Sequence, residues 1–272
     1  MSEVAFYQVD AFAESALAGN PAAVMPLNAF LPDALMQAIA AENNLAETAF
    51  VVAKGDGVWD LRWFTPAIEV PLCGHATLAS AHVIFSCLGH AGDAIGFDTK
   101  SGRLTVRQLD DGRLEMDFPA IPVHRIEPPS GLSQALGAEP REVYEGSFVM
   151  AVFDSADDVR ALRPDIRALK NIGGLGPDTR GNFICTAPGD NGFDVVSRFF
   201  APGSGIDEDP ATGSAHCNLA PYWSERLGKA ELSCFQAYPG RGGVIATRVA
   251  GERVALIGRA RTVIEGVFHL SE

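Results

Sequence analysis

One motif occurs twice in this chain of 272 residues. Residues 62–79 read RWFTPAIEVPLCGHATLA, and residues 198–220 read RFFAPGSGIDEDPATGSAHCNLA. Both copies run Arg, aromatic, Phe, one further residue and Pro, then an acidic stretch, then Pro-x-x-Gly with His or Ser before Ala. Arg62 and Arg198 lie 136 positions apart, and the later prolines of the motif lie 139 apart. An offset near half of the chain length predicts two halves of one design rather than a solenoid of many short repeats.

Each copy is expected to join a strand to a buried helix. The β-rich run before each motif ends at a turn that contains proline. Pro71 and Pro210 then stand where proline starts a helix, because its missing N–H is no loss there. Residues 74–85 and 213–223 carry small and apolar side chains on almost every side, which predicts helices buried all round. We expect Pro221 to shorten or kink the second helix.

The rest of the chain is dominated by expected strands. Surface helices are expected at 32–44 and 163–171, opened by Pro-Asp or Arg-Pro. Alternating or β-branched segments, several bounded by glycine turns, predict strands at 6–12, 48–52, 103–109, 113–118, 146–153, 182–187, 243–250, 253–258 and 261–270. The pattern predicts an α+β protein of two similar domains, each a barrel-like mixed sheet around one central helix.

Prolines at 119, 122, 128 and 129 mark the expected boundary between the halves. We place the first domain at 1–124 together with a C-terminal strand at about 262–272, and the second at 125–261.

Charge and cysteine usage indicate which binding partners and which cellular compartment to expect. The chain has 34 acidic and 21 basic side chains, a net charge of −13, which repels nucleic acid and anionic membrane surfaces. The start MSEVAFYQVDAFAE has acidic residues where a signal peptide has a basic region, and no stretch approaches about 20 uninterrupted apolar residues. Five scattered cysteines without a CxxC pair fit a reducing compartment. We expect a cytoplasmic protein that binds neither nucleic acid nor membrane.

The motif places Gly74 and Gly213 at the first turn of the two expected helices. Free N–H groups at a helix start, with the positive end of the helix dipole, bind anions, and glycine lets a ligand approach the backbone. Two such starts facing each other across a domain cleft would clamp a small carboxylate-bearing molecule. Alternatively, both are ordinary strand–turn–helix joints whose glycines serve packing alone, and the spacing leaves both interpretations open.

Several motifs together are similar to one known family. They are QVDAF and GNPAAV near the start, NLAETAFV and EVPLCGHATLASAHVIF in the first half, and GIDEDPATGSAH and QAYPGRGG in the second. On these the chain resembles the PhzF-like isomerases of phenazine biosynthesis and their relatives, within the diaminopimelate epimerase superfamily. The resemblance covers nearly the whole chain. It implies two domains of diaminopimelate epimerase-like fold with the site between them, a homodimer, and catalysis without cofactor or metal.

Glu47, in Leu-Ala-Glu-Thr-Ala, matches the family's catalytic acid/base, which moves a proton between carbons of the substrate. That role requires a partly desolvated carboxylate, whose pKa rises toward the working pH. The apolar neighbours Leu45, Ala46 and Phe50 are consistent with such a setting. Without the resemblance, a lone glutamate at the end of a helix is usually a surface residue.

His75 and Asp209 match the family's other two polar site residues, and its binding positions fall on Gly74, Gly213 and Ser214. A histidine at a helix N-terminus is expected to have a lowered pKa and to stay neutral, so that it donates one hydrogen bond and accepts another. Asp209 can orient a substrate amine or hydroxyl, and its position also suits an N-terminal cap of the following helix.

Cys73 and Thr212 occupy equivalent positions before the two glycines. Epimerases of the superfamily use two opposed thiols, one to remove a proton and one to return it. Because threonine does not exchange that proton at neutral pH without activation, two-base racemization is disfavoured. One-sided abstraction with dehydration stays open, and so does the possibility that Cys73 is only a small buried residue.

Metal and nucleotide sites are not expected. His216 and Cys217 are adjacent and point about 100° apart on a helix, and the other histidines show no ligand spacing or HExxH pattern. The glycine cluster at 173–176 lacks a nucleotide-binding fingerprint.

Three functions therefore stay in view. The first is a PhzF-like isomerase in which Glu47 shuttles a proton while His75 and Asp209 assist. The second is a Cys73-dependent amino-acid epimerase or dehydratase. The third is a non-catalytic protein that binds a small molecule. The expected ligand in every case is a small anionic carboxylate.

Overall fold

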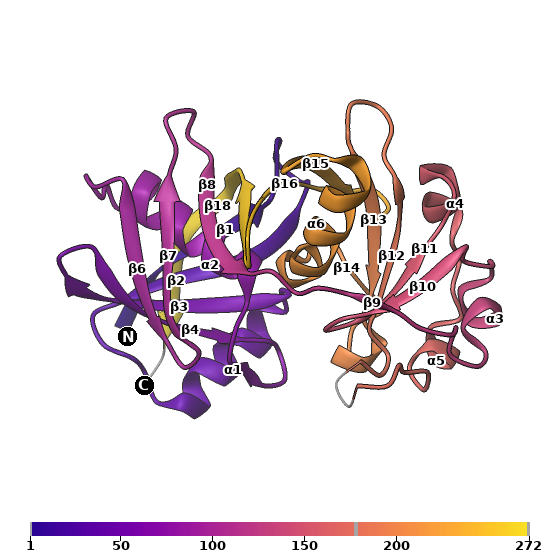
Figure 1. Cartoon of the computed structure of the whole chain (residues 1–272). Coiled ribbons are helices and arrows are strands. Elements are labelled where there is room, and N and C mark those ends of the chain that lie inside the picture. The colour runs from indigo at the N-terminus through magenta and orange to yellow at the C-terminus, as the bar shows by residue number, and fades with distance from the viewer. Residues whose placement is uncertain (1, 177–178, 271–272) are drawn as a thin grey trace. The chain divides into compact units, whose positions relative to one another are not determined.

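The computed structural model describes residues 2–176 and 179–270. The chain divides into two compact units (Figure 1). The first unit takes in the chain up to Asp117 together with the part from Ile257 onward, and the second unit spans Phe118–Leu256. The last strand, β18, runs Ala260–Leu270, and residues 271–272 of the expected C-terminal strand lie outside the described residues.

The first unit is built on one mixed sheet. Its hydrogen-bonded order is β18-β1-β2-β3-β4-β6-β7-β8, with β2/β3 and β4/β6 parallel and the other neighbours antiparallel. The short β5 pairs with the end of β4. The bounds are β1 Ser2–Ala11, β2 Asn20–Leu27, β3 Glu47–Gly55, β4 Val58–Phe64, β5 Glu69–Val70, β6 Ala94–Thr99, β7 Gly102–Gln108 and β8 Leu114–Pro119.

Two helices pack on this sheet. The helix α2, Gly74–His82, continues into a π-helical turn at Val83–Cys87 and packs against β1, β2 and β3. Every residue from His75 to Ala81 is buried, which confirms the prediction of a helix buried all round. The helix α1, Asp33–Asn43, packs Met36 and its neighbours into a separate apolar cluster with residues of β2, β3 and β4.

The second unit repeats this topology. Its order is β9-β10-β11-β12-β13-β15-β16, and β11/β12 and β13/β15 are the parallel pairs. The short β14 pairs with the end of β13 as β5 does with β4. The bounds are β9 His124–Arg125, β10 Glu142–Glu145, β11 Val149–Val152, β12 Phe183–Pro188, β13 Val195–Phe200, β14 Glu208–Asp209, β15 Glu231–Gln236, β16 Gly243–Ala250 and β17 Arg253–Gly258.

Helices cover both faces of this second sheet. Alternate residues of β11 point to opposite faces: Val149 and Ala151 join the cluster of the short helices, and Met150 and Val152 join the cluster of α6. The short helices are α3 Leu132–Leu136, α4 Ala156–Ala161, α5 Ile166–Leu169 and the 3-10 turn Pro202–Ser204, whereas α6 runs Gly213–Leu227.

Pro221 lies inside α6, which continues to Leu227, so this proline does not shorten the helix, and a kink stays a prediction. Two other helix predictions were wrong in detail. Pro71 and Pro210 lie three residues before α2 and α6 begin, whose N-caps are Cys73 and Thr212. The helix expected at 163–171 is the four-residue α5, while the preceding α4 begins with an unexpected capping box of Ser155 and Asp158.

The acidic stretch of each motif copy carries an arginine clamp. Arg62 binds Glu69 through two hydrogen bonds of 2.8 Å, and Arg198 binds Glu208 through bonds of 2.7 and 2.8 Å. Arg62 holds the pKa of Glu69 at about 2, against the opposing effect of burial. Both clamps fasten a two-residue strand to its neighbour just before a helix begins, which explains why the motif starts with arginine.

Across the described residues, no helix is both long and apolar enough to cross a membrane.

Candidate functional site

The start of α2 collects three of the candidate residues. Cys73 is the N-cap and His75 is the second residue of the helix, and both are buried. Glu47 opens β3 rather than ending a helix, because α1 stops at Asn43 and Asn44 turns the chain with a left-handed φ of 48°. The strands β2 and β3 run parallel with Glu47 opposite Ala22, and Asn20, two residues earlier at the start of β2, brings its side chain to His75.

His75 is the centre of the group. Its Nε2 lies 2.8 Å from Glu47 Oε2, and the two side chains are only 7% and 16% exposed. Its Nδ1 lies 3.1 Å from Asn20 Nδ2 and 3.5 Å from Cys73 Sγ. With the Asn20 amide donating to Nδ1, a neutral ring carries its proton on Nε2, the nitrogen that faces Glu47.

The expectation of a lowered His75 pKa was wrong in direction. Burial acts to lower this pKa, but interactions with Cys73 and Glu47 outweigh burial and raise the pKa of His75 well above its ordinary value. Burial also raises the pKa of the Cys73 thiol to about 11, so that the thiol is protonated at neutral pH. The carboxylate of Glu47 is therefore the anion that favours a charged imidazole.

Glu47 meets His75 through one carboxylate oxygen. Oε2 is buried and, among the described residues, accepts no hydrogen bond, so the 2.8 Å approach of His75 is an ion pair without hydrogen-bond alignment. A buried carboxylate oxygen beside a charged imidazole can accept a proton from a carbon acid and return it, while the imidazole balances its charge.

The start of α6 is organised around a hydroxyl instead. Thr212 Oγ1 donates to Asp209 Oδ2 at 2.5 Å and accepts from Gln236 Nε2 at 3.0 Å. Gln236 Oε1 accepts from the Thr212 backbone N–H at 2.8 Å. The hydroxyl proton of Thr212 is thus committed to Asp209. Asp209 belongs to β14 and binds the N-cap residue without being the cap itself, which corrects that expectation.

The first turn of α6 holds the remaining candidates. Gly213 is its first residue and Ser214, the second, is exposed. His216 lies one turn further, where its Nδ1 contacts the Thr212 carbonyl at 2.8 Å. Burial lowers the pKa of His216 to about 4, so this ring is neutral at pH 7. In the first unit, Gly74 holds the matching first position of α2.

The sequence analysis missed Asn20 and Gln236. Both lie in quoted motifs, GNPAAV and QAYPGRGG. Their roles depend on strand register, which brings a residue 55 positions from His75 and another 24 positions from Thr212 into contact.

Glu47, Cys73 and His75 also form a group of metal-ligating side chains. One ligand atom from each lies within 4.8 Å of the other two, and no second such group occurs within 2–176 and 179–270. Ligand spacing in the sequence did not indicate this group, because Glu47 comes from a strand far from the Cys-x-His pair.

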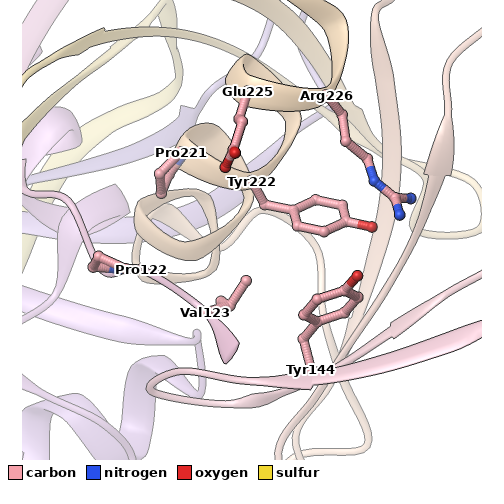
Figure 2. Close-up of a pocket in the computed structure, with 7 residues that line it drawn as sticks. All are labelled: Pro122, Val123, Tyr144, Pro221, Tyr222, Glu225 and Arg226. Carbon is pink, nitrogen blue, oxygen red and sulfur yellow. The ribbon is translucent and has the colours of Figure 1, made fainter. Parts of the chain in front are cut away.

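A pocket of about 470 Å³ lies elsewhere, on the second unit. Figure 2 shows its lining, in which Tyr144 of β10 faces Tyr222 on α6, with Arg226 beside them. Its helical residues lie eight or more positions after Gly213, about 12–20 Å along the helix axis. The pocket therefore lies away from the polar group at the start of α6.

The duplicated sheet-and-helix units define an epimerase-like α+β fold. A crystal structure of a hydroxyproline epimerase from Agrobacterium vitis matches with a TM-score of 0.59 over 98% of this chain and 91% of that chain. Its sequence identity is 12%, so the likeness concerns the fold alone.

The family is narrower than the fold. Residues 9–266 match the family described as phenazine biosynthesis-like protein. A Pseudomonas aeruginosa protein named "Uncharacterized isomerase" is 48% identical over 268 residues, 98% of this chain and 100% of that protein. The crystal structure of a PhzF family protein from Enterococcus faecalis has 42% identity and a TM-score of 0.92, covering 99% of this chain and 100% of that chain. The chain belongs to the phenazine biosynthesis-like (PhzF) family.

Proposed function

We propose that this chain is an isomerase that needs no cofactor or metal and moves a proton between carbon atoms of a small carboxylate-bearing substrate. Glu47 is the general acid and base. The observation that carries the proposal is the buried contact between Glu47 Oε2 and His75 Nε2 at 2.8 Å, in which the carboxylate oxygen accepts no hydrogen bond from the described residues. Relatives named as isomerases support the reaction class.

His75 assists because the positive charge of its protonated ring offsets the negative charge of the Glu47 carboxylate. A protonated ring stabilises ionised Glu47. In that state both ring nitrogens donate, so the Asn20 amide holds the ring by turning its oxygen to Nδ1–H at the position where the two side chains meet. Because Glu47 takes and returns the proton from one position, the proton is removed and delivered on the same face of the substrate.

Binding is assigned to the helix starts. Gly74 on α2, and Gly213 and Ser214 on α6, present first-turn N–H groups that suit a substrate carboxylate. Asp209 contacts a substrate amine or hydroxyl, and Cys73 and Thr212 line the two helix starts. As the resemblance to the PhzF-like family implies, the active form is a homodimer.

The test is solvent deuterium uptake by a panel of small carboxylates, followed by mass spectrometry. Wild type should exchange one carbon-bound hydrogen of its substrate, and Glu47→Gln should abolish both exchange and turnover while retaining ligand binding and the folded circular dichroism spectrum. The matched control is Glu42→Gln, which removes an exposed carboxylate near the end of α1. Full activity of Glu47→Gln would refute the mechanism.

A Cys73-dependent epimerase or dehydratase is the competing function. Its support is the 3.5 Å approach of Cys73 Sγ to His75 Nδ1. Against it, burial raises the pKa of the thiol to about 11, which disfavours a thiolate base. Loss of turnover in Cys73→Ser, combined with turnover in Glu47→Gln, would favour this alternative.

A further inference from the structure

The loop between β1 and β2 holds an exposed leucine in an unusual backbone conformation. Leu17 has a φ of 68° and is 70% exposed. In this left-handed region a side chain other than that of Asn or Asp is disfavoured, because its Cβ comes too close to the backbone. A leucine at this position therefore strains the backbone, and its exposed side chain offsets little of that strain by burial.

Leu17 differs from the other left-handed residues of the chain. Within 2–176 and 179–270, five residues other than glycine have a positive φ. Three of them are Asn or Asp, which tolerate this conformation, and Phe12 is fully buried, so that its burial offsets the strain. Single exposed apolar side chains are common on protein surfaces and indicate nothing by themselves. The combination of strain and exposure at Leu17 is what the stability of the fold does not explain.

The backbone of this loop is fixed by a buried carboxylate. The Leu17 N–H donates to Asp10 Oδ2 at 2.7 Å, and Asp10 is 1% exposed. Two residues further, Gly19 has a φ of 63°, and a Cβ there would lie 2.1 Å from the Ala11 carbonyl oxygen. The loop is thus held against the end of β1, and the backbone of Leu17 stays in one place while its side chain lies in solvent.

The loop lies at the end of the sheet that carries the proton-transfer group. The strand β1 ends opposite Asn20, the first residue of β2, and the Asn20 side chain contacts His75. Leu17 comes three residues before Asn20, so their Cα atoms are at most about 11 Å apart. An apolar side chain is therefore available beside the groups that exchange the proton.

A second exposed leucine adjoins the same group. Leu72 is 42% exposed and directly precedes Cys73, the N-cap of α2. Its counterpart before Thr212, the N-cap of α6, is Ala211, which is fully buried. At this position the first helix start has an exposed isobutyl group, and the second has a buried methyl group.

We propose that Leu17 and Leu72 contact an apolar part of the substrate, and that the enzyme is selective for carboxylates with an aliphatic chain or ring. The substrate carboxylate lies at the first-turn N–H groups of α2, and the apolar part lies over the two leucines. This position of the substrate rests on the proposed function. Contact with the substrate gives Leu17 the apolar burial that it lacks in the free protein.

A series of carboxylates that differ in their apolar part tests the proposal. The probes are acetate, butanoate, hexanoate and cyclohexanecarboxylate, and the Kd of each is measured by NMR titration of the full chain. For wild type, the Kd should fall about two- to fourfold for each added CH₂, the change expected when a CH₂ group moves from water to an apolar contact. Cyclohexanecarboxylate should bind more tightly than acetate.

Two variants remove the apolar contacts one at a time. Leu17→Asn and Leu72→Asn should bind acetate as wild type does and lose most of the dependence of Kd on chain length. Because Asn tolerates a left-handed φ, Leu17→Asn should unfold at the same or a higher urea concentration than wild type. The matched control is Leu88→Asn, at a 39% exposed leucine just after the π-helical turn, at the opposite end of α2 from Cys73. It should keep the full dependence.

The outcomes separate this contact from the chemistry of Glu47. A wild-type Kd that does not fall from acetate to hexanoate overturns the proposal, and a variant that keeps the wild-type dependence overturns the contact at that leucine. Glu47→Gln should retain the dependence, because binding needs no proton transfer. A failed role of Glu47 therefore leaves the Kd series unchanged, and a failed apolar contact leaves the deuterium exchange test of Glu47 intact.

Discussion

The starts of α2 and α6 have the same backbone arrangement but different side chains at matching positions. In the first unit the N-cap is Cys73 and the second helical residue is His75; in the second unit these positions are Thr212 and Ser214. Strand register identifies the residue of the second unit that corresponds to Glu47. Phe64 pairs with Thr48, and its counterpart Phe200 pairs with Phe183. Glu47, one position before Thr48, therefore corresponds to Asn182.

The first unit has three titratable side chains at these positions, Glu47, Cys73 and His75. Their counterparts in the second unit, Asn182, Thr212 and Ser214, do not titrate. Asn182 accepts a hydrogen bond from Ser204, and the Thr212 hydroxyl is bound on both sides. The N-cap of the second helix is thus held by fixed hydrogen bonds, whereas the first helix start holds an ion pair between His75 and Glu47 Oε2. The two units share one framework, and the side chains proposed for proton transfer occur in only one of them.

The largest expected effect separates Glu47 from its counterpart Asn182. Glu47→Gln should lower kcat by about 10²–10⁴-fold, the usual contribution of a general acid or base. Asn182→Ala should change kcat less than about tenfold, since it removes only an acceptor for Ser204. Steady-state kinetics on the substrate found by deuterium uptake measures both. Comparable losses in the two variants would contradict the assignment of proton transfer to the first unit.

The two arginine clamps should differ in stability. The Arg198 and Glu208 side chains are 4% and 12% exposed, against 16% and 17% for Arg62 and Glu69. Arg198→Ala should cost about 3–5 kcal/mol because it leaves a buried charge unpaired. Arg62→Ala should cost about 1–3 kcal/mol. Urea unfolding followed by circular dichroism measures both, and a larger loss for Arg62→Ala would reverse the comparison.

Lowering the pH should destabilise the contact of His216 on α6 but not the matching contact of Thr77 on α2. His216 and Thr77 both bind the carbonyl four residues earlier, but only His216 titrates. Its folded pKa of about 4 lies below the unfolded value of about 6.5, so stability is lost as pH falls from 6.5 toward 4. The loss at pH 4 should be about 3 kcal/mol. His216→Gln should remove that loss in urea unfolding at pH 7 and pH 4, and an unchanged acid slope would count against a neutral buried ring.

The smallest effect concerns the N-cap itself. Thr212→Cys gives the second unit the residue of the first, but sulfur replaces the short bond to Asp209 by a weaker one. Unfolding free energy should fall by about 1–2 kcal/mol, and deuterium uptake should stay at the wild-type level. A variant with increased deuterium uptake would show that a thiol at this position takes part in proton transfer.

The sequence predicted the framework better than the contacts. The spacing of the repeat located both buried helices and the glycines at their first positions, because small residues and the clamp arginines are local signals. The pairs Asn20–His75 and Thr212–Gln236 were not predictable, because their distances depend on which residues of parallel strands align. The direction of the His75 pKa was missed for the same reason: the helix start alone suggests a neutral ring, and only tertiary contact with Glu47 reverses it.

The pairing of the first and last strands has a consequence for the order of folding. Along its whole length β1 pairs with β18, from Ser2 opposite Leu270 to Ala11 opposite Ala260. The first unit therefore lacks an edge strand until Ala260–Leu270 has been synthesised, although most of this unit is synthesised first. The second unit is one uninterrupted stretch, Phe118–Leu256, and has all its residues earlier. During synthesis the later-made half can fold to completion while the half that carries Glu47 waits for its closing strand.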